Sequence, residues 1–142
     1  MKTFKLKIVT LDGEPFCGNA ERLLVRTTEG DIEILAGHAD AIATISAGRV
    51  KITAPDVFSS EKYQKGERLA AVSGGFLSVV SGEVKLVATT FEFQDEIDIN
   101  RAKQAKEKAE TAIKRASTER EETLAKAKLL RAMTRIDVSG IK

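Results

Sequence analysis

Three arginines in the C-terminal third of the chain, Arg101, Arg131 and Arg135, are the residues whose type and spacing most clearly suggest binding chemistry. Arg131 and Arg135 are four residues apart, so on a helix they share one face. If the two helical segments expected here fold back on each other, that face meets Arg101. Three guanidinium groups at one corner repel each other unless anions neutralise them.

Two kinds of anion can neutralise this corner, and the residues leave both open. The first is a set of carboxylates on the chain itself, Glu92, Glu96 and Asp98, each worth under about 1 kcal/mol as a surface ion pair. The second is a bound polyphosphate, whose oxygens suit the planar fork of arginine. Spacing alone favours the ion-paired alternative.

Residue types used in catalysis do not occur in a productive arrangement. His38 is the sole histidine, which excludes a histidine metal cluster, and Cys17 is the sole cysteine, which excludes an internal disulfide. We therefore predict no catalytic residue and no metal site, and a chain that is not an enzyme by itself.

Residues 1–90 have the pattern of an antiparallel β-sandwich. Apolar residues alternate, or form short runs broken by glycine, with turn residues at intervals of roughly ten. The expected strands span residues 3–11, 23–25, 32–35, 41–46, 50–54, 69–72, 76–80 and 84–88.

From about Phe93 the chain becomes rich in Ala, Lys, Glu and Arg, with apolar residues three or four positions apart, which predicts helices. Asp98 is placed to cap the first helix. Thr118 with Glu121 forms a capping box for the second. Because the connection between the helices is short, we expect an antiparallel two-helix hairpin over residues 91–142.

The expected apolar stripe of the first helix is almost entirely alanine. Exchanging a core leucine for alanine forfeits on the order of 2 kcal/mol or more of burial per position, while alanine-rich helices retain a high intrinsic propensity. We therefore hypothesise that the hairpin is bistable and can open and close. The stripe consists of Ala102, Ala105, Ala109, Ala112, Ile113 and Ala116.

Composition is that of a globular chain, with 42% apolar residues, 31% charged residues and a net charge of +2. No segment approaches the roughly 20 apolar residues that span a bilayer, so we expect an intracellular chain that meets membranes only through a partner. Nucleic-acid binding by the helices is disfavoured because acidic residues intersperse the basic ones. These are Glu107, Glu110, Glu119, Glu121 and Glu122.

Two stretches of the β part resemble a known family. Residues 30–39, Gly-Asp-Ile-Glu-Ile-Leu-Ala-Gly-His-Ala, are similar to the stretch ending Ile-Leu-Pro-Gly-His-Ala in the epsilon subunit of F-type ATP synthases. Residues 73–77, Ser-Gly-Gly-Phe-Leu, resemble that family's Ser-Gly-Gly strand. Ala36 and Asp40 stand where the family usually has proline, and Glu33 where it usually has glycine.

The resemblance implies a β-sandwich of about ten strands over residues 1–90, followed by a helical hairpin over residues 91–142. In the family the sandwich binds the gamma subunit and rests on the membrane-embedded ring of c subunits, as the foot of the rotor. Asp31 and His38 match positions that face the ring. The implied location is peripheral, on the cytoplasmic face of the bacterial plasma membrane, without insertion into it.

The family's helices either fold against the sandwich or extend along gamma into the catalytic head of alpha and beta subunits, where they inhibit ATP hydrolysis. A subset of bacterial members binds ATP on the folded hairpin as a regulatory ligand, and no other cofactor is implied. Lys108 stands where those members often have arginine. The residues that match the ATP-binding pattern are Glu92, Ile97, Asp98, Arg101, Ala102, Arg131 and Arg135.

The leading prediction is therefore a non-catalytic rotor subunit that couples rotation of the ring to the catalytic head and brakes hydrolysis with its helices. An alternative from another class is a free-standing ATP-sensing module, which would need no gamma partner.

Overall fold

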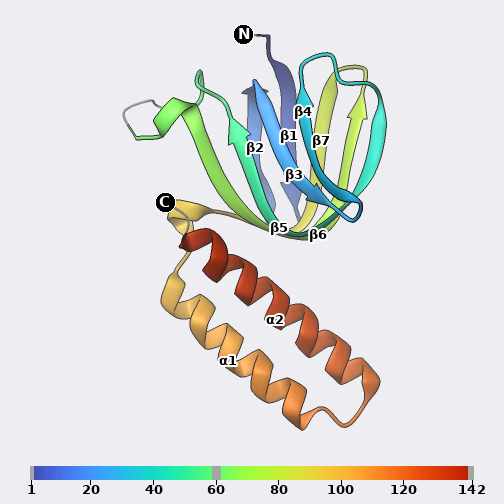
Figure 1. The fold of residues 1–142 in the computed structure, drawn as a ribbon, viewed down its shortest axis with the longest axis vertical. Coiled ribbons are helices and arrows are strands. Elements are labelled where there is room, and N and C mark those ends of the chain that lie inside the picture. Colours follow the sequence, from blue (N-terminus) through green and yellow to red (C-terminus); the bar gives the residue numbers. More distant parts are fainter. Residues whose placement is uncertain (1, 59–61, 141–142) are drawn as a thin grey trace.

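The computed structural model describes residues 2–58 and 62–140 (Figure 1). Within them the chain forms seven β-strands, two short 3-10 turns and two α-helices. The strands come first and the helices last, and the antiparallel helical pair hangs below the β domain. The elements are β1 Phe4–Thr10, β2 Gly13–Ala20, β3 Arg22–Thr27, β4 Gly30–Leu35, β5 Ala41–Thr53, η1 Gln64–Gly66, β6 Glu67–Val80, β7 Glu83–Phe93, η2 Gln94–Glu96, α1 Ile99–Arg115 and α2 Glu119–Ser139.

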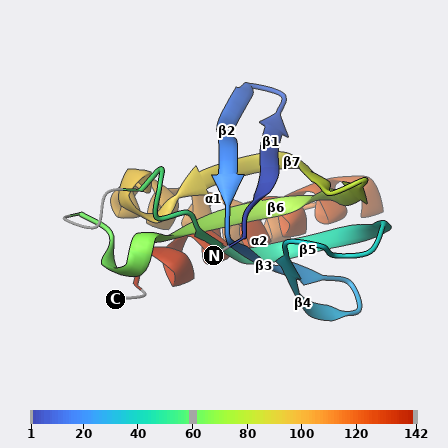
Figure 2. The ribbon, with the colours of Figure 1, turned by 90° about the horizontal axis from the view of Figure 1, so that it is seen from above.

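The strands form one sheet in the order β2-β1-β7-β6-β5-β3-β4, and the sheet curves until its two ends face each other as a sandwich. Every neighbouring pair is antiparallel except β1 and β7, which run parallel. Viewed from above, the helices lie beneath the central strands (Figure 2). The predicted class, a β-sandwich followed by a helical hairpin, is confirmed.

Several turn residues mark bends inside long strands instead of strand ends. The stretches expected at 41–46 and 50–54 are one strand, β5, and those at 69–72 and 76–80 are one strand, β6. Gly74 and Gly75 have φ of +62° and +140°, which lets β6 bend while staying paired with β7. A Cβ at Gly75 would also clash with the backbone of Val87. Each of these long strands therefore belongs to both layers of the sandwich, one layer on each side of its bend.

Alternating apolar residues fill the space between the layers. Complete burial of an aliphatic side chain of this kind contributes roughly 1.5–3 kcal/mol. The β domain therefore has an apolar core of its own, formed by buried residues between Phe4 and Phe93. The largest side chains with an exposed fraction of 0% are Leu6, Ile8, Leu23, Ile34, Ile52 and Leu86.

Both helices begin at the residues that capping rules predict. The carboxylate of Asp98 accepts a hydrogen bond from the backbone N–H of Arg101 at 3.1 Å. The hydroxyl of Thr118 accepts one from the N–H of Glu121, also at 3.1 Å. The Glu121 carboxylate reaches back to the N–H and hydroxyl of Ser117, so this capping box closes one residue earlier than the usual pattern.

The seam between the helices is made largely of alanine, as expected. Ala102 and Ala109 of α1 are buried, while Ala112, expected in the same stripe, is exposed. From α2 the seam receives Ala125 and Ala132, both buried. The main contacts with β5 and β6 come from α2, so α1 is attached to the β domain mostly through its partner helix.

Candidate functional site

Five of the seven residues predicted to bind a nucleotide meet at one cavity. This hairpin cavity has a volume of about 360 Å³ and lies where the end of β7, the η2 turn and the two helices come together. Its full lining is Glu92, Glu96, Asp98, Arg101, Ala102, Ala105 and Arg135.

Charges of both signs face the hairpin cavity. Arg135 Nε of α2 lies 3.6 Å from Glu92 Oε1 of β7, and both side chains are about one third exposed. Within residues 2–58 and 62–140, the side chain of Arg101 has no ion-pair or hydrogen-bond partner. The same residues contain no group of three acidic, histidine or cysteine side chains that could hold a metal ion. The lining thus contains three carboxylates and two guanidinium groups, and the Arg101 guanidinium is the one that an incoming anion could meet without displacing an ion pair.

Two predicted residues, Ile97 and Arg131, do not line this cavity. Ile97 is half-buried between η2 and α1. Arg131 lines a separate, mostly apolar cavity of about 380 Å³ between α2 and the β6 bend at Gly74. Four residues advance a helix by about 40° beyond a full turn, so Arg135 reaches Glu92 at the end of β7 while Arg131 lies near the bend of β6.

The two residues predicted to face a c-subunit ring lie at opposite ends of β4. Asp31 is the second residue of the strand, and its carboxylate is 3.1 Å from Arg26 Nε. His38 lies three residues beyond the strand, where its Nδ1–H donates to the carbonyl of Ala39 at 2.7 Å. The structure does not bring them together.

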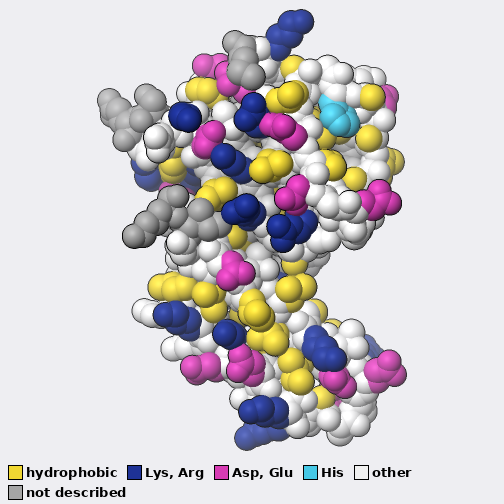
Figure 3. Space-filling model, viewed as in Figure 1, with side chains coloured by type: hydrophobic (Ala, Val, Ile, Leu, Met, Phe, Trp, Pro, Cys, Tyr) yellow, Lys and Arg dark blue, Asp and Glu magenta, His cyan; other side chains and the backbone are white. Residues whose placement is uncertain are grey.

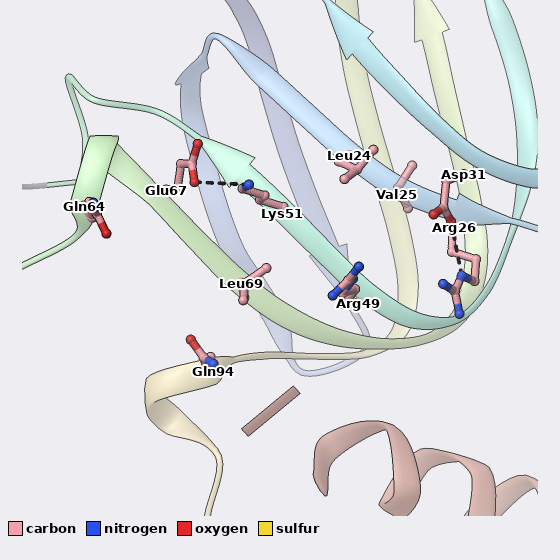
Figure 4. Close-up of a pocket in the computed structure, with 10 residues that line it drawn as sticks. All are labelled: Leu24, Val25, Arg26, Asp31, Arg49, Lys51, Gln64, Glu67, Leu69 and Gln94. Atoms are coloured by element: carbon pink, nitrogen blue, oxygen red, sulfur yellow. Dashed lines mark hydrogen bonds and ion pairs between the residues drawn. The ribbon is translucent and has the colours of Figure 1, made fainter. Parts of the chain in front are cut away.

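Asp31 and Arg26 stand at the edge of a further cavity, of about 340 Å³, on the outer face of β3, β5 and β6 (Figure 4). A second pair, Lys51 Nζ and Glu67 Oε2 at 3.2 Å, lies along the same face. Since two of the three basic side chains that line this cavity are paired with carboxylates, it offers an anion less positive charge than its arginines and lysine suggest.

One polar cluster next to the hairpin cavity was not foreseen. Asp95 of η2 accepts hydrogen bonds from Tyr63 Oη and from Arg68 Nη2, each at 2.6 Å. Partial burial by itself would raise the pKa of Asp95, but the bonds from Tyr63 and Arg68 outweigh it and lower the pKa to about 2. The partners are 32 and 27 residues away in sequence, so no local pattern could have revealed the cluster.

Two family models cover nearly the whole chain. The model described as "ATP synthase, Delta/Epsilon chain, beta-sandwich domain" matches residues 3–94, and that described as "ATP synthase, Delta/Epsilon chain, long alpha-helix domain" matches residues 95–140. The chain belongs to the ATP synthase delta/epsilon family. Its two modules occur in the order that the resemblance implied.

Curated relatives of the ATP synthase delta/epsilon family match over their full length. The proteins named "ATP synthase epsilon chain" from Bacillus velezensis and Bacillus pumilus are 37% and 35% identical over 140 residues, with 99% of each chain covered. That of Ruminococcus albus is 36% identical over 143 residues, with 100% of each chain covered. The predicted resemblance to epsilon subunits is confirmed.

Solved structures of ATP synthases contain chains of the same fold. A chain of the Euglena gracilis mitochondrial enzyme superposes with a TM-score of 0.72 at 20% identity, covering 96% of this chain and 81% of that one. A chain of the Tetrahymena thermophila enzyme gives a TM-score of 0.62 at 14% identity, covering 97% of both. In the described part of this family member, no helix is long and apolar enough to cross a membrane.

Proposed function

We propose that this chain is a non-catalytic rotor subunit of an F-type ATP synthase, with a regulatory helical hairpin. The observation that carries the proposal is the match of both modules, over 99% of the chain, to proteins named ATP synthase epsilon chain. The titles of the two structures of similar fold describe an assembly of OSCP, F1 and c-ring and one of central stalk and c-ring.

In this role the sandwich binds a gamma subunit and rests on the ring of c subunits, at the cytoplasmic face of a bacterial plasma membrane. The candidate ring contacts are Asp31 and His38. An interaction of Asp31 with the ring would compete with its ion pair to Arg26. His38 keeps its second ring nitrogen for a partner, because within the described residues its hydrogen bond uses Nδ1. Since these residues lie at opposite ends of β4, the proposed footprint spans that strand.

Loose docking of the hairpin supports a regulatory role. Leu130 of α2 and Ala47 of β5 both line two separate cavities, of about 300 and 380 Å³, between the helix and the sandwich. Leu130 remains 53% exposed. The space-filling view shows the molecule indented where the hairpin meets the sandwich (Figure 3). Unfilled space of this kind weakens an interface compared with the close-packed core of the sandwich.

Opening the hairpin therefore costs little, and its alanine seam lowers the cost further. The released helices would extend along gamma toward the alpha and beta subunits and inhibit ATP hydrolysis there. The separated helices can keep helical structure, because a composition rich in alanine, lysine and glutamate has a high intrinsic helix propensity.

The hairpin cavity is the proposed site for regulatory ATP. Arg101 comes from α1 and Arg135 from α2, so phosphate oxygens bound between them would join the two helices. Glu96 and Asp98 provide acceptors for an amino group of the base. ATP at about ten times its dissociation constant would stabilise the closed form by roughly 1.4 kcal/mol, a tenfold shift in population. Arg131, one turn away, would act at the edge of the site.

Removal of residues 98–142 from the assembled synthase tests the regulatory proposal. We expect the truncated chain to co-purify with gamma and the ring, and the assembly to hydrolyse ATP faster than with the full chain. Unchanged hydrolysis in an intact assembly would exclude the brake. The alternative, a free-standing ATP sensor, is supported by a cavity whose lining comes entirely from this chain. It would be favoured if the full chain binds ATP alone and does not associate with gamma.

A further inference from the structure

The cluster around Asp95 lies at the junction of the sandwich and the hairpin. The guanidinium of Arg68 stacks 3.6 Å from the centre of the Phe93 ring and 4.6 Å from that of Tyr63. It is covered on its other sides as well, and its side chain is only 14% exposed. A planar cation held against two rings and bonded to a carboxylate has little rotational freedom. Asp95 is therefore held to the β domain by Arg68 and Tyr63, with a further ion pair to the exposed Lys62 at 3.6 Å.

The η2 turn that carries Asp95 also contacts the C-terminal end of α2, at the base of the hairpin. The side-chain amide of Gln94 donates to the carbonyl of Val138, in the last turn of α2, at 2.8 Å. Residues 94–96 thus form a small platform, held to the sandwich through Asp95 and touching α2 through Gln94. Glu96, which follows Asp95 in the chain, lines the hairpin cavity.

Beyond this platform the direct attachment of α1 to the sandwich is weak. Ile97 and Asp98 have extended backbone angles, with φ and ψ of −73° and 122° for Ile97 and −84° and 102° for Asp98. Two extended residues between a fixed turn and a helix form a joint that can absorb changes of φ and ψ. Most of the contacts of α1 are with α2.

We propose that Asp95, clamped by Arg68 and Tyr63, is a positioning residue that fixes the sandwich side of a hinge at Ile97–Asp98. The clamp sets where Glu96, Asp98 and Arg101 stand when the hairpin closes, and so prepares the hairpin cavity for its anion. The part of this inference that concerns ligand affinity rests on the proposed nucleotide function. The hinge itself does not.

The clamp works at every pH at which such an assembly operates. Asp95 stays ionised because the bonds from Tyr63 and Arg68 hold its pKa at about 2. Replacement by asparagine keeps the shape and removes the charge, which weakens the bond from Arg68 without opening the core. The β domain should stay folded while residues 94–98 gain freedom.

Two measurements on the full-length chain test the clamp. The first is the distance between spin labels at Lys85 on β7 and Lys114 near the end of α1, both exposed, with Cys17 replaced by serine. The second is calorimetric titration with ATP. The variants are Asp95→Asn and the milder Tyr63→Phe, which removes the hydrogen bond from Tyr63 and keeps the ion pairs of Asp95 with Arg68 and Lys62. The matched control is Asp56→Asn, an exposed aspartate outside the cluster.

We expect Asp95→Asn to broaden the label distances and to weaken ATP binding roughly five- to tenfold, as typical for loss of a coupled positioning contact. Tyr63→Phe should give smaller changes in the same direction, and Asp56→Asn none. Distances and affinity equal to those of the unmodified chain in both clamp variants would overturn the proposal. If the unmodified chain binds no ATP, the nucleotide function fails, and the label distances still decide whether Asp95 fixes the hinge. If Asp95→Asn unfolds the sandwich, Tyr63→Phe decides.

Discussion

Arg135 of α2 lies 3.6 Å from Glu92 of β7, an ion pair that joins the second helix directly to the sandwich. The first helix has no comparable link to the β domain among the ion pairs of the described residues. Both partners are about one third exposed, so the pair contributes no more than about 1 kcal/mol. A phosphate group at the hairpin cavity would therefore meet an arginine that is held weakly enough to turn toward it.

Replacement of Arg135 by alanine should weaken ATP binding at least tenfold, since a charge-assisted bond contributes about 1.5–3 kcal/mol. Arg131→Ala should have a smaller effect, because Arg131 lines a different cavity. Calorimetry on the isolated chain measures both. Arg120→Ala, at the exposed start of α2, is the control. Equal affinities for Arg135→Ala and the unmodified chain would mean that this arginine serves only its ion pair with Glu92.

Enlargement of Ala132 to leucine should push the helices apart. Ala132 has an exposed fraction of 0%, and overpacking of such a site costs about 1–3 kcal/mol. We expect faster amide hydrogen exchange in the hairpin, with exchange in the sandwich unchanged. Ala112→Leu adds the same atoms at an exposed position and should leave exchange as it was. Slower exchange in the Ala132 variant would contradict the idea that the helices approach closely only because alanine lies between them.

The stability of the sandwich should fall between about pH 4 and pH 2 because of Asp95. Its pKa is about 2 in the folded chain and about 3.9 in an unfolded one, so its contribution is complete above the unfolded value and is lost as the pH falls through the folded one. Asp95 is 36% exposed, and after allowance for screening this amounts to about 1 kcal/mol. Denaturant titrations of Asp95→Asn should show a shallower pH dependence in this range. An identical slope would argue against the Tyr63 and Arg68 contacts.

The two roles of Asp98, helix cap and cavity residue, can be separated. Asparagine caps a helix about as well as aspartate, whereas alanine costs about 1 kcal/mol. Asp98→Asn should therefore keep the helical circular dichroism and its melting curve, and Asp98→Ala should lower both. Both variants should reduce ATP affinity if the carboxylate contacts the ligand. Full affinity in Asp98→Asn would restrict this residue to capping.

Features that act over three or four residues could be predicted from the sequence. The caps at Asp98 and Thr118 are of this kind, because donor and acceptor belong to the same turn. Gly74 and Gly75 indicated an interruption correctly, but whether a glycine pair ends a strand or bends it depends on the neighbouring strand, which here stays paired on both sides of the bend.

Contacts between distant segments could not be predicted in the same way. The helical spacing put Arg131 and Arg135 on one side of α2, yet only the placement of the sandwich decides that each lines a different cavity. The bonds of Asp95 to Tyr63 and Arg68 depend on how the segment before β6 passes the end of β7. Contacts between residues this far apart in the chain leave no periodic pattern in a single sequence.

The position of β7 within the sheet has a mechanical consequence. This strand leads directly into the tail, and it lies between β1 on one side and β6 on the other. A pull on the tail along the direction of β7 would load both ladders in shear and strain many hydrogen bonds together, whereas an edge strand could peel away one bond at a time. The β domain can therefore keep its form when the tail that it anchors is placed under load.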